Sequence, residues 1–320
     1  MGDPEQTAEA LREAMLALRT TLGRVLVGQR AVVDGVLVGL LAGGHVLLEG
    51  VPGLGKTLLI KALGRGLSLK VGRVQFTPDL MPADILGTRT LHETPSGPEL
   101  QFRPGPIFTE LLLADEINRA NPRTQAALLE AMAEQQVTVD GETRPLGPPF
   151  FVMATENPID MEGTYPLPEA QADRFLVKLH VPSPSAEELF DILDVNPEAG
   201  LAAITPAVGR AQLLTFQAHV RGILAADAVK HQIVDLICKT RPENLPARFK
   251  AHVQLGASPR GAQALLASAR ARAALAGRIH VSPEDVRASA LACLRHRILL
   301  GFAARADGVT ADDIIAALVG

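Results

Sequence analysis

The chain has 320 residues, which at about 100 to 200 residues per domain allows two or at most three domains, and its formal net charge is −4. Hydrophobic residues make up 47% and charged residues 21%, a composition of folded globular proteins that excludes a disordered chain. Its two cysteines, Cys238 and Cys293, cannot form a disulfide framework and show no C-x-x-C spacing, which favours a reducing compartment.

The beginning of the chain shows no targeting or membrane signal. Its first residues are acidic and polar, whereas a secretory signal peptide needs a basic start followed by an apolar run. The most apolar stretch, residues 31–48, contains Asp34, His45 and four glycines, and it is shorter than the roughly 20 apolar residues of a spanning helix. We therefore expect a cytoplasmic protein without membrane insertion.

The predicted elements of the first half alternate between strands and helices. A helix follows Gly28-Gln29-Arg30, and a short buried strand at residues 45–50 opens into a glycine-rich turn and a second helix. Further buried strands are predicted at residues 71–76, 108–116 and 149–157, with helical segments between them. This alternation favours an α/β fold in which helices cover both faces of a parallel sheet.

Two segments predict β-hairpins that are inserted beside helices. Residues 88–103 show alternating side chains around the turn Pro95-Ser96-Gly97-Pro98, and residues 136–146 contain Asp140-Gly141 between alternating segments. Neither segment extends the pattern of the buried strands. We therefore expect both hairpins to stand apart from the central sheet.

The composition changes near residue 183. Ser185 and Glu188 form a capping box, and from there the pattern is helical almost to the end of the chain. We predict a sheet domain over residues 1–183, followed by a smaller all-helical domain over residues 184–320.

The charge is divided unevenly along the chain. Residues 1–204 contain 16 basic and 27 acidic residues (16 − 27 = −11), and residues 205–320 contain 15 basic and 8 acidic residues (15 − 8 = +7). Such a division is typical of a nucleic-acid-binding arm or of domains that meet opposite charge in a neighbouring subunit. With no Trp, one Tyr and 3% aromatic residues, base stacking is weakly supported. We favour packing of the basic second half of one subunit against the acidic first half of the next, which predicts that a higher salt concentration favours monomers.

Residues 50–57, GVPGLGKT, match G-x-x-x-x-G-K-[ST] without a mismatch, between a predicted strand and a predicted helix. Glycines let backbone N–H groups approach a polyphosphate, and the helix N-terminus adds positive potential. Lys56 is expected to reach the β- and γ-phosphates, and the Thr57 hydroxyl to ligate Mg²⁺. The residues predicted to bind the nucleotide are Gly50, Val51, Pro52, Gly53, Leu54, Gly55, Lys56, Thr57 and Leu58, with Asp115 from the next motif.

A second motif follows about sixty residues later, where the buried strand at residues 111–114 ends in Asp115 and Glu116. In parallel sheets, ligands bind at the carboxyl ends of the strands, so both carboxylates are expected beside the phosphates. We assign Asp115 to the Mg²⁺ shell together with Thr57, and Glu116 to the polarisation of the attacking water. The chain contains no N-K-x-D segment for a guanine base, which favours ATP.

Several segments together resemble the MoxR family of AAA+ ATPases. They are GGHVLLEGVPGLGKT, GPIF followed by LLLADEINRA, TQAALLEAM, ATENPIDMEGTYPLPEAQADRF and GASPRG, and the match runs from about Val25 to about Leu300. The resemblance implies an αβα nucleotide domain, a helical lid and a head-to-tail ring, usually a hexamer. It also implies that the two hairpins are the helix-2 insert and the pre-sensor-1 insert of this branch.

The resemblance assigns roles to three further residues. Asn157 corresponds to sensor 1, which orients the water against the γ-phosphate, and Arg174 in the segment DRF corresponds to the arginine finger that reaches the neighbouring subunit's ATP. Arg260 in GASPRG corresponds to sensor 2. Simpler explanations stay open at each position: a strand-end cap for Asn157, a surface ion pair for Arg174 and a solvated helix-start arginine for Arg260.

The chain departs from the family pattern at three positions. Glu156 stands where the family often has Gln, Glu110 where it often has Asn, and Ala172 where it commonly has Leu. Carboxylates near a tetra-anionic ligand would weaken nucleotide binding unless they point away from it. The Ala172 position affects packing only.

The resemblance implies a chaperone-like machine that matures or assembles other protein complexes, including insertion of metal cofactors, commonly with a partner that carries a von Willebrand factor A domain. A nucleic-acid motor or loader of the same AAA+ branch is the first alternative, with the basic second half as its contact surface. A P-loop phosphotransferase acting on a small metabolite is the second, although Glu116 and Arg174 would then lack a purpose.

Overall fold

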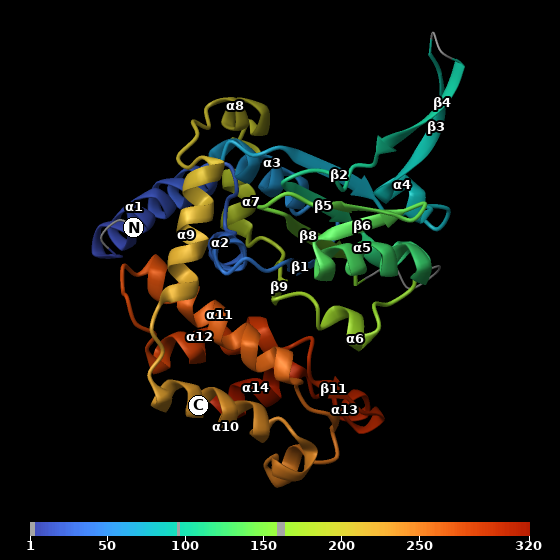
Figure 1. Ribbon diagram of the computed structural model, residues 1–320. Coiled ribbons are helices and arrows are strands. Elements are labelled where there is room, and N and C mark those ends of the chain that lie inside the picture. Colours follow the sequence, from blue (N-terminus) through green and yellow to red (C-terminus); the bar gives the residue numbers. More distant parts are fainter. Residues whose placement is uncertain (1–3, 95–96, 159–163) are drawn as a thin grey trace.

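The structure, a computed structural model, describes residues 4–94, 97–158 and 164–320. At its centre lies a five-stranded parallel sheet with the strand order β2-β5-β8-β1-β9 (Figure 1). Its strands are β1 (Val46–Glu49), β2 (Val71–Gln75), β5 (Leu111–Asp115), β8 (Phe151–Glu156) and β9 (Val177–His180). The parallel sheet confirms the predicted α/β class.

Alternate residues of the strands pack into separate hydrophobic clusters, as they must in a sheet that is covered on both faces. In β5, Leu111 and Leu113 belong to one cluster of buried side chains, and Leu112 and Ala114 belong to another. The helices that contribute to the first cluster include α1 (Pro4–Gly23), α2 (Arg30–Leu41) and α3 (Lys56–Gly66), and α4 (Pro82–Leu86) and α5 (Pro122–Glu134) contribute to the second. The sheet is therefore the middle of three layers.

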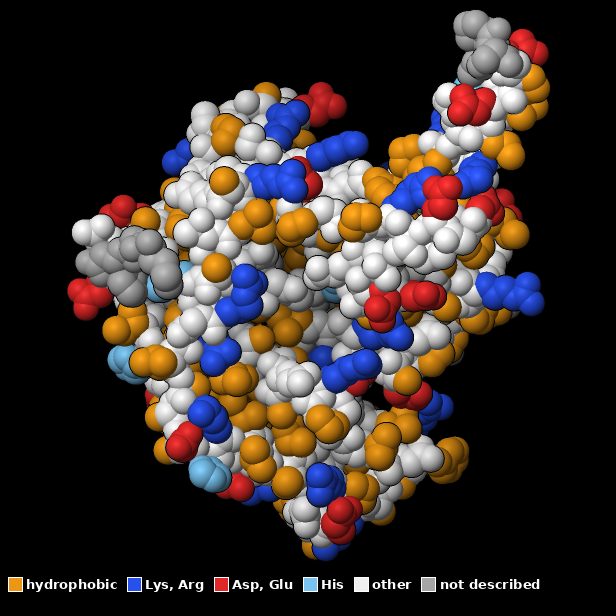
Figure 2. All heavy atoms as spheres, in the orientation of Figure 1, with side chains coloured by type: hydrophobic (Ala, Val, Ile, Leu, Met, Phe, Trp, Pro, Cys, Tyr) orange, Lys and Arg blue, Asp and Glu red, His pale blue; other side chains and the backbone are white. Residues whose placement is uncertain are grey.

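Two β-hairpins stand apart from this sheet. Their strands are β3 (Gly87–Thr94) paired with β4 (Gly97–Pro104), and β6 (Gln136–Val139) paired with β7 (Glu142–Pro145). The first hairpin projects from the body of the molecule as an arm on which hydrophobic and charged side chains are interspersed (Figures 1 and 2). Pro95 and Ser96 of its predicted turn lie outside the described residues.

From residue 169 onward the chain is mainly helical. The helices are α6 (Glu169–Ala172), α7 (Ala186–Leu193), α8 (Pro197–Ala202), α9 (Arg210–Gly222), α10 (Asp227–Lys239), α11 (Pro259–Leu275), α12 (Pro283–Leu294), α13 (Phe302–Asp307) and α14 (Ala311–Val319). Two short strands, β10 (Val253–Leu255) and β11 (Leu299–Leu300), pair antiparallel, and 3₁₀ turns occur at Ile117–Arg119, Pro242–Asn244 and Ala247–Phe249. In the described part of the chain, no helix combines the length and the apolar character that crossing a membrane requires.

The helices beyond β9 fall into two groups. α8 contacts α3, and α9 contacts α1 and α2, so these helices pack against the part that contains the sheet. α10, α11, α12 and α14 pack on one another below that part in Figure 1, and α11 reaches back to α1, α2 and α9. Because one hydrophobic core runs through both groups, the division into residues 1–183 and 184–320 stays a prediction.

Candidate active site

The predicted phosphate loop connects β1 to α3. Gly53 and Gly55 have φ angles of 84° and 74°, in the left-handed region that favours glycine. Gly55 is the N-cap of α3 and has no side chain to cover the first N–H groups of the helix, which therefore remain for an anion. At Gly50, a Cβ atom would lie 2.9 Å from both Cβ and the carbonyl oxygen of Val181. The glycines at positions 53 and 55 thus give the loop the open backbone that phosphate binding needs, whereas Gly50 is required by the close approach of Val181.

The loop borders a cavity of about 850 Å³, named the phosphate cavity here. Of the residues that the sequence assigns to the nucleotide, those that line it are Pro52, Gly53, Leu54, Gly55, Lys56, Thr57, Leu58, Asp115, Glu116 and Asn157. Gly50 and Val51 belong to the loop but lie outside the lining. Lys56 donates a hydrogen bond from Nζ to the carbonyl of Gly50, and burial lowers the pKa of Lys56 while nearby carboxylates oppose this effect. Two motifs far apart in the sequence therefore meet in one cavity.

The phosphate cavity has an apolar side that the sequence analysis missed. It is formed by residues 25–27, before α2, and by Leu189 and Ile192 of α7. Gln29 links this side to the loop, because its Nε2 donates to the carbonyl of Leu54 at 2.6 Å. The sequence shows the apolar residues of α7, but only the structure shows that none of them is buried in the core. An apolar cleft beside a phosphate loop suits the planar base of a nucleotide.

The two acidic residues at the end of β5 are held by a threonine of the neighbouring strand β8. The Thr155 hydroxyl donates to Oδ1 of Asp115 at 2.8 Å and accepts the backbone N–H of Glu116 at 2.8 Å. Thr155 is fully buried, so its position in the sequence looks like an ordinary core site. Glu116 has a φ angle of 57°, a conformation that costs a residue other than glycine about 1 to 3 kcal/mol. Such strain is typical of functional sites.

Side chains of β2 and of the turn after β5 bind the same two carboxylates. Arg73 donates from Nη2 to Oδ2 of Asp115 at 2.7 Å and to Gln75 at 2.8 Å. Gln75 donates to Oε2 of Glu116 at 3.0 Å, and Arg119 donates to the same oxygen at 2.9 Å. Protein donors therefore orient both carboxylates.

Asn157 follows β8 and lines the phosphate cavity with only 4% of its surface exposed. The side-chain amide of Asn118 donates to the Asn157 carbonyl at 3.2 Å, which ties the turn after β5 to the end of β8. Residues 159–163, which continue this motif, lie outside the described residues. The structure thus places Asn157 in the same cavity as Asp115 and Glu116.

Glu110, one of the two unusual carboxylates, lies at the end of β5 opposite to Asp115. Its Oε2 accepts the backbone N–H of Lys70 at 2.7 Å, and its other oxygen lies 3.4 Å from the Arg210 guanidinium. It does not line the phosphate cavity. This departure from the family pattern is therefore remote from the site.

Glu156, the other unusual carboxylate, is compensated by a lysine. Its carboxylate lies 3.2 Å from Nζ of Lys178, which also pairs with Glu49 at the end of β1. Burial disfavours the ammonium group, but Glu156 and Glu49 together outweigh this effect and raise the pKa of Lys178. Glu156 is thus paired between strands, although it shares the single positive charge of Lys178 with Glu49.

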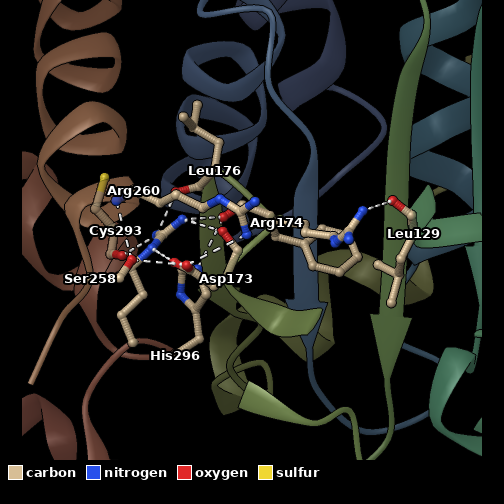
Figure 3. A network of polar contacts seen from close by, with 10 residues as sticks. Leu129, Asp173, Arg174, Leu176, Ser258, Arg260, Cys293 and His296 are labelled. Atoms are coloured by element: carbon tan, nitrogen blue, oxygen red, sulfur yellow. Dashed lines mark hydrogen bonds and ion pairs between the residues drawn. The ribbon is translucent and has the colours of Figure 1, made fainter. Parts of the chain in front are cut away.

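Arg174 and Arg260 are not at the phosphate cavity. They line a separate hollow of about 360 Å³, named the arginine hollow here, whose lining also includes Met132, Asp173, Leu176 and Arg297. Arg174 is half-buried and donates from Nη1 to the carbonyl of Leu129 at 2.8 Å (Figure 3). The Arg260 side chain is 55% exposed and lies 3.9 Å from the Asp173 carboxylate. The structure therefore divides the predicted catalytic residues between two surfaces.

Comparisons with known proteins cover both parts of the chain. Residues 45–177 match the family described as ATPase family associated with various cellular activities (AAA), and residues 246–318 match the AAA lid domain. The first match contains the phosphate loop, both carboxylates and Arg174, and the second contains Arg260.

Three similar proteins extend these matches to most of the chain. Uncharacterized protein YeaC of Bacillus subtilis is 45% identical over 92% of this chain and 89% of its own length. Chaperone MoxR1 of Mycobacterium tuberculosis is 43% identical over 91% of this chain and 77% of its own length. A crystal structure from Cytophaga hutchinsonii, whose name proposes an ATPase, has a TM-score of 0.88 at 35% identity and covers 98% of this chain and 96% of that chain.

Proposed function

Because this chain belongs to the MoxR family of AAA+ ATPases, we propose that it hydrolyses ATP in a head-to-tail ring, a hexamer as is usual in the family, and thereby remodels other proteins. The observation that carries the proposal is the division of the candidate catalytic residues between the phosphate cavity and the arginine hollow. When two protomers meet head to tail, the phosphate cavity of one and the arginine hollow of the other can act on the same nucleotide.

The phosphate cavity fits ATP with Mg²⁺. Backbone donors at the start of α3 and Nζ of Lys56 would hold the phosphates, and the oxygens of Thr57 and Asp115 are the hard ligands that Mg²⁺ prefers. Bound Mg²⁺ would polarise the phosphoryl oxygens. Glu116 would take the proton of the attacking water, and Asn157 would orient that water. These residues bind and prepare the nucleotide within one protomer.

The arginine hollow would supply the remaining charge. Among the described residues that line it are Arg174, Arg260 and Arg297 against one carboxylate, Asp173, an excess of two positive charges (3 − 1 = 2). A polyanion such as a neighbouring protomer's triphosphate is attracted to such a surface. There, Arg174 would offset the charge that develops during phosphoryl transfer, and Arg260 would bind the same phosphates.

The substrate of the ring is proposed from its relatives. The name of chaperone MoxR1 points to protein clients. This chain would mature or assemble protein complexes in the cytoplasm, including the insertion of metal cofactors, together with a partner that carries a von Willebrand factor A domain. The variant Glu116→Gln would bind ATP without cleaving it, so a pull-down with this variant should retain both the client and the partner.

Two inactive variants test the shared site. Arg174→Ala should keep ATP binding and lose turnover by about a thousandfold, and Glu116→Gln should also bind without turning over because it lacks the base. When mixed, they should regain activity, because the intact arginine of one variant meets the intact carboxylate of the other. If differently tagged variants co-purify as mixed rings that are as inactive as the separate variants, the shared site is refuted.

A further inference from the structure

Arg174 lies in a short segment between α6 and β9. The residues just before and after Arg174 contact side chains that precede α11 or follow α12. This segment, residues 173–176, is named the finger segment here. Figure 3 shows that the Arg174 side chain runs toward Leu129, whereas the Asp173 side chain lies among Ser258, Arg260 and His296. The residue before Arg174 therefore faces the C-terminal helices, and Arg174 itself faces away from them.

Arg297, which follows α12, makes most of these contacts. Its Nε donates to Oδ1 of Asp173 at 2.7 Å, and its Nη2 donates to the carbonyls of Asp173 at 3.0 Å and Phe175 at 2.6 Å. Its Nη1 donates to the carbonyls of Leu176 at 3.1 Å and Cys293. A guanidinium has five N–H groups, so each donor of Arg297 has an acceptor. Three of the acceptors are backbone carbonyls that flank Arg174.

The buried surroundings of Arg297 require an arginine at this position. Its side chain is only 2% exposed, so an unpaired donor would be left without water. Ser258, the N-cap of α11, donates to Oδ2 of Asp173 at 2.9 Å, and the Nε2 of His296 contacts the carbonyl of Phe175 at 3.1 Å. Lysine could not replace the planar fork of arginine at such a set of acceptors. The finger segment is therefore fixed to the C-terminal helices by side-chain contacts.

We propose that Arg297 is a positioning residue for Arg174, through which the C-terminal helices hold the finger segment so that Arg174 reaches the neighbouring nucleotide. The inference rests on the proposed function, because it presupposes that Arg174 acts on the ATP of another protomer. Arg297 borders the arginine hollow, but its side chain is 2% exposed and all its N–H groups are bonded within the chain, so it would not contact the nucleotide itself. Its loss should therefore impair a protomer as a donor of Arg174 while leaving the protomer's own phosphate cavity competent.

The mixed rings described above separate these two roles. In the donor arrangement, Arg297→Lys is combined with Glu116→Gln and mixed with Arg174→Ala protomers, whose phosphate cavities perform the hydrolysis. In the acceptor arrangement, Arg297→Lys is combined with Arg174→Ala and mixed with Glu116→Gln protomers. We expect the rate to fall at least about tenfold in the donor arrangement, because small misplacements of catalytic groups are costly, and to change less than about twofold in the acceptor arrangement.

Arg295→Lys is the matched control. Arg295 lies two residues before Arg297 and pairs with Asp312 at 3.1 and 2.7 Å, away from the finger segment, so its replacement should leave both arrangements within about twofold. If Arg297→Lys fails to fold, as judged by its melting temperature, Asp173→Asn takes its place with the same expected asymmetry.

Two results would count against the inference in different ways. Equal losses in the donor and acceptor arrangements, or no loss in either, would overturn the positioning role of Arg297 while the reference mixture of Arg174→Ala and Glu116→Gln stays active. An inactive reference mixture would instead overturn the proposed function, and the positioning role with it.

Discussion

The phosphate cavity and the arginine hollow differ in how their residues are held. In the cavity, the residues assigned to the phosphates and Mg²⁺ follow the ends of strands of one sheet, and the backbone conformation of the loop sets the positions of the binding groups. In the hollow, a segment before β9 is held by Arg297, which is 124 positions away from Asp173 in the chain. Under the proposed function, phosphate binding would depend on one folded sheet, whereas hydrolysis would also depend on the C-terminal helices and on a second protomer.

Dilution should have the largest effect, because it should abolish hydrolysis while leaving ATP binding intact. The fraction of ATP-binding sites that are competent should not depend on protein concentration, because the phosphate cavity is complete in one protomer. Turnover per protomer should fall by about a thousandfold or more below the assembly concentration, as expected for the loss of an arginine finger. Equilibrium binding of a fluorescent ATP analogue and steady-state hydrolysis, measured over the same concentrations, test this. A turnover that stays constant for a stable monomer would contradict the division into two regions.

Acidification should weaken the sheet that supports the phosphate cavity. His45, just before β1, accepts the N–H of Val152 at its Nδ1, and its Nε2 lies 3.3 Å from the carbonyl of Met132. Burial lowers the pKa of His45 to about 4, an effect that the Met132 carbonyl partly opposes. Because the pKa in the unfolded chain is about 6.5, stability is full above pH 6.5 and declines as the pH falls toward 4. This one group should lower the free energy of unfolding by about 2 kcal/mol between pH 7 and pH 5.

Urea unfolding of the parent and of His45→Gln at both pH values isolates this contribution. Glutamine can accept and donate hydrogen bonds but does not titrate, so the variant should lose about 2 kcal/mol less than the parent over this interval. The same pH dependence in both proteins would show that His45 is not responsible.

Removal of Arg73 should change the affinity of the phosphate cavity for Mg²⁺, with a smaller effect than the changes above. Its guanidinium pairs with Oδ2 of Asp115, the residue that we assign to Mg²⁺, and the Arg73 side chain is 50% exposed. Exposed ion pairs are worth up to about 1 kcal/mol, so Arg73→Ala should tighten Mg²⁺ binding to the ATP complex by at most about fivefold. A Mg²⁺ titration of bound fluorescent ATP analogue measures this. Arg119→Ala, which changes a partner of Glu116 instead, is the control, and weaker Mg²⁺ binding in Arg73→Ala would show that Arg73 contacts the phosphates.

The smallest effect is expected at Glu156. Its carboxylate is paired with Lys178, a partner that it shares with Glu49, and it does not line the phosphate cavity, so Glu156→Gln should change the ATP dissociation constant by less than about twofold. Isothermal titration calorimetry of the parent and the variant makes the comparison. A marked gain in affinity would mean that the carboxylate repels the phosphates in spite of Lys178.

The sequence predicted best those features that depend on residues close together in the chain. The α/β class followed from the alternation of buried strands and helices, and it is confirmed by the parallel sheet. The loop at residues 50–57 and the pair Asp115-Glu116 could be located because glycine content, a lysine and a strand end are local properties. Structure then placed most of them in one cavity.

Other features depended on partners that no local pattern identifies. Thr155 occupies an ordinary core position in the sequence, and only the pairing of β8 with β5 brings its hydroxyl to Asp115 and Glu116. Likewise, the pairing of β1 with both β8 and β9 brings Lys178 to Glu156, whose charge seemed unfavourable when it was considered alone.

The sequence by itself determined the α/β class, because hydrophobic periodicity is a property of short stretches of the chain, and its motifs gave the resemblance to the family. Tertiary structure decided where Arg174 and Arg260 lie, and it alone revealed that Arg297 donates hydrogen bonds to the finger segment. The physical reason is that a buried charged group must find acceptors wherever the packing brings them. Such acceptors are set by contacts between distant parts of the chain, which the order of residues does not display.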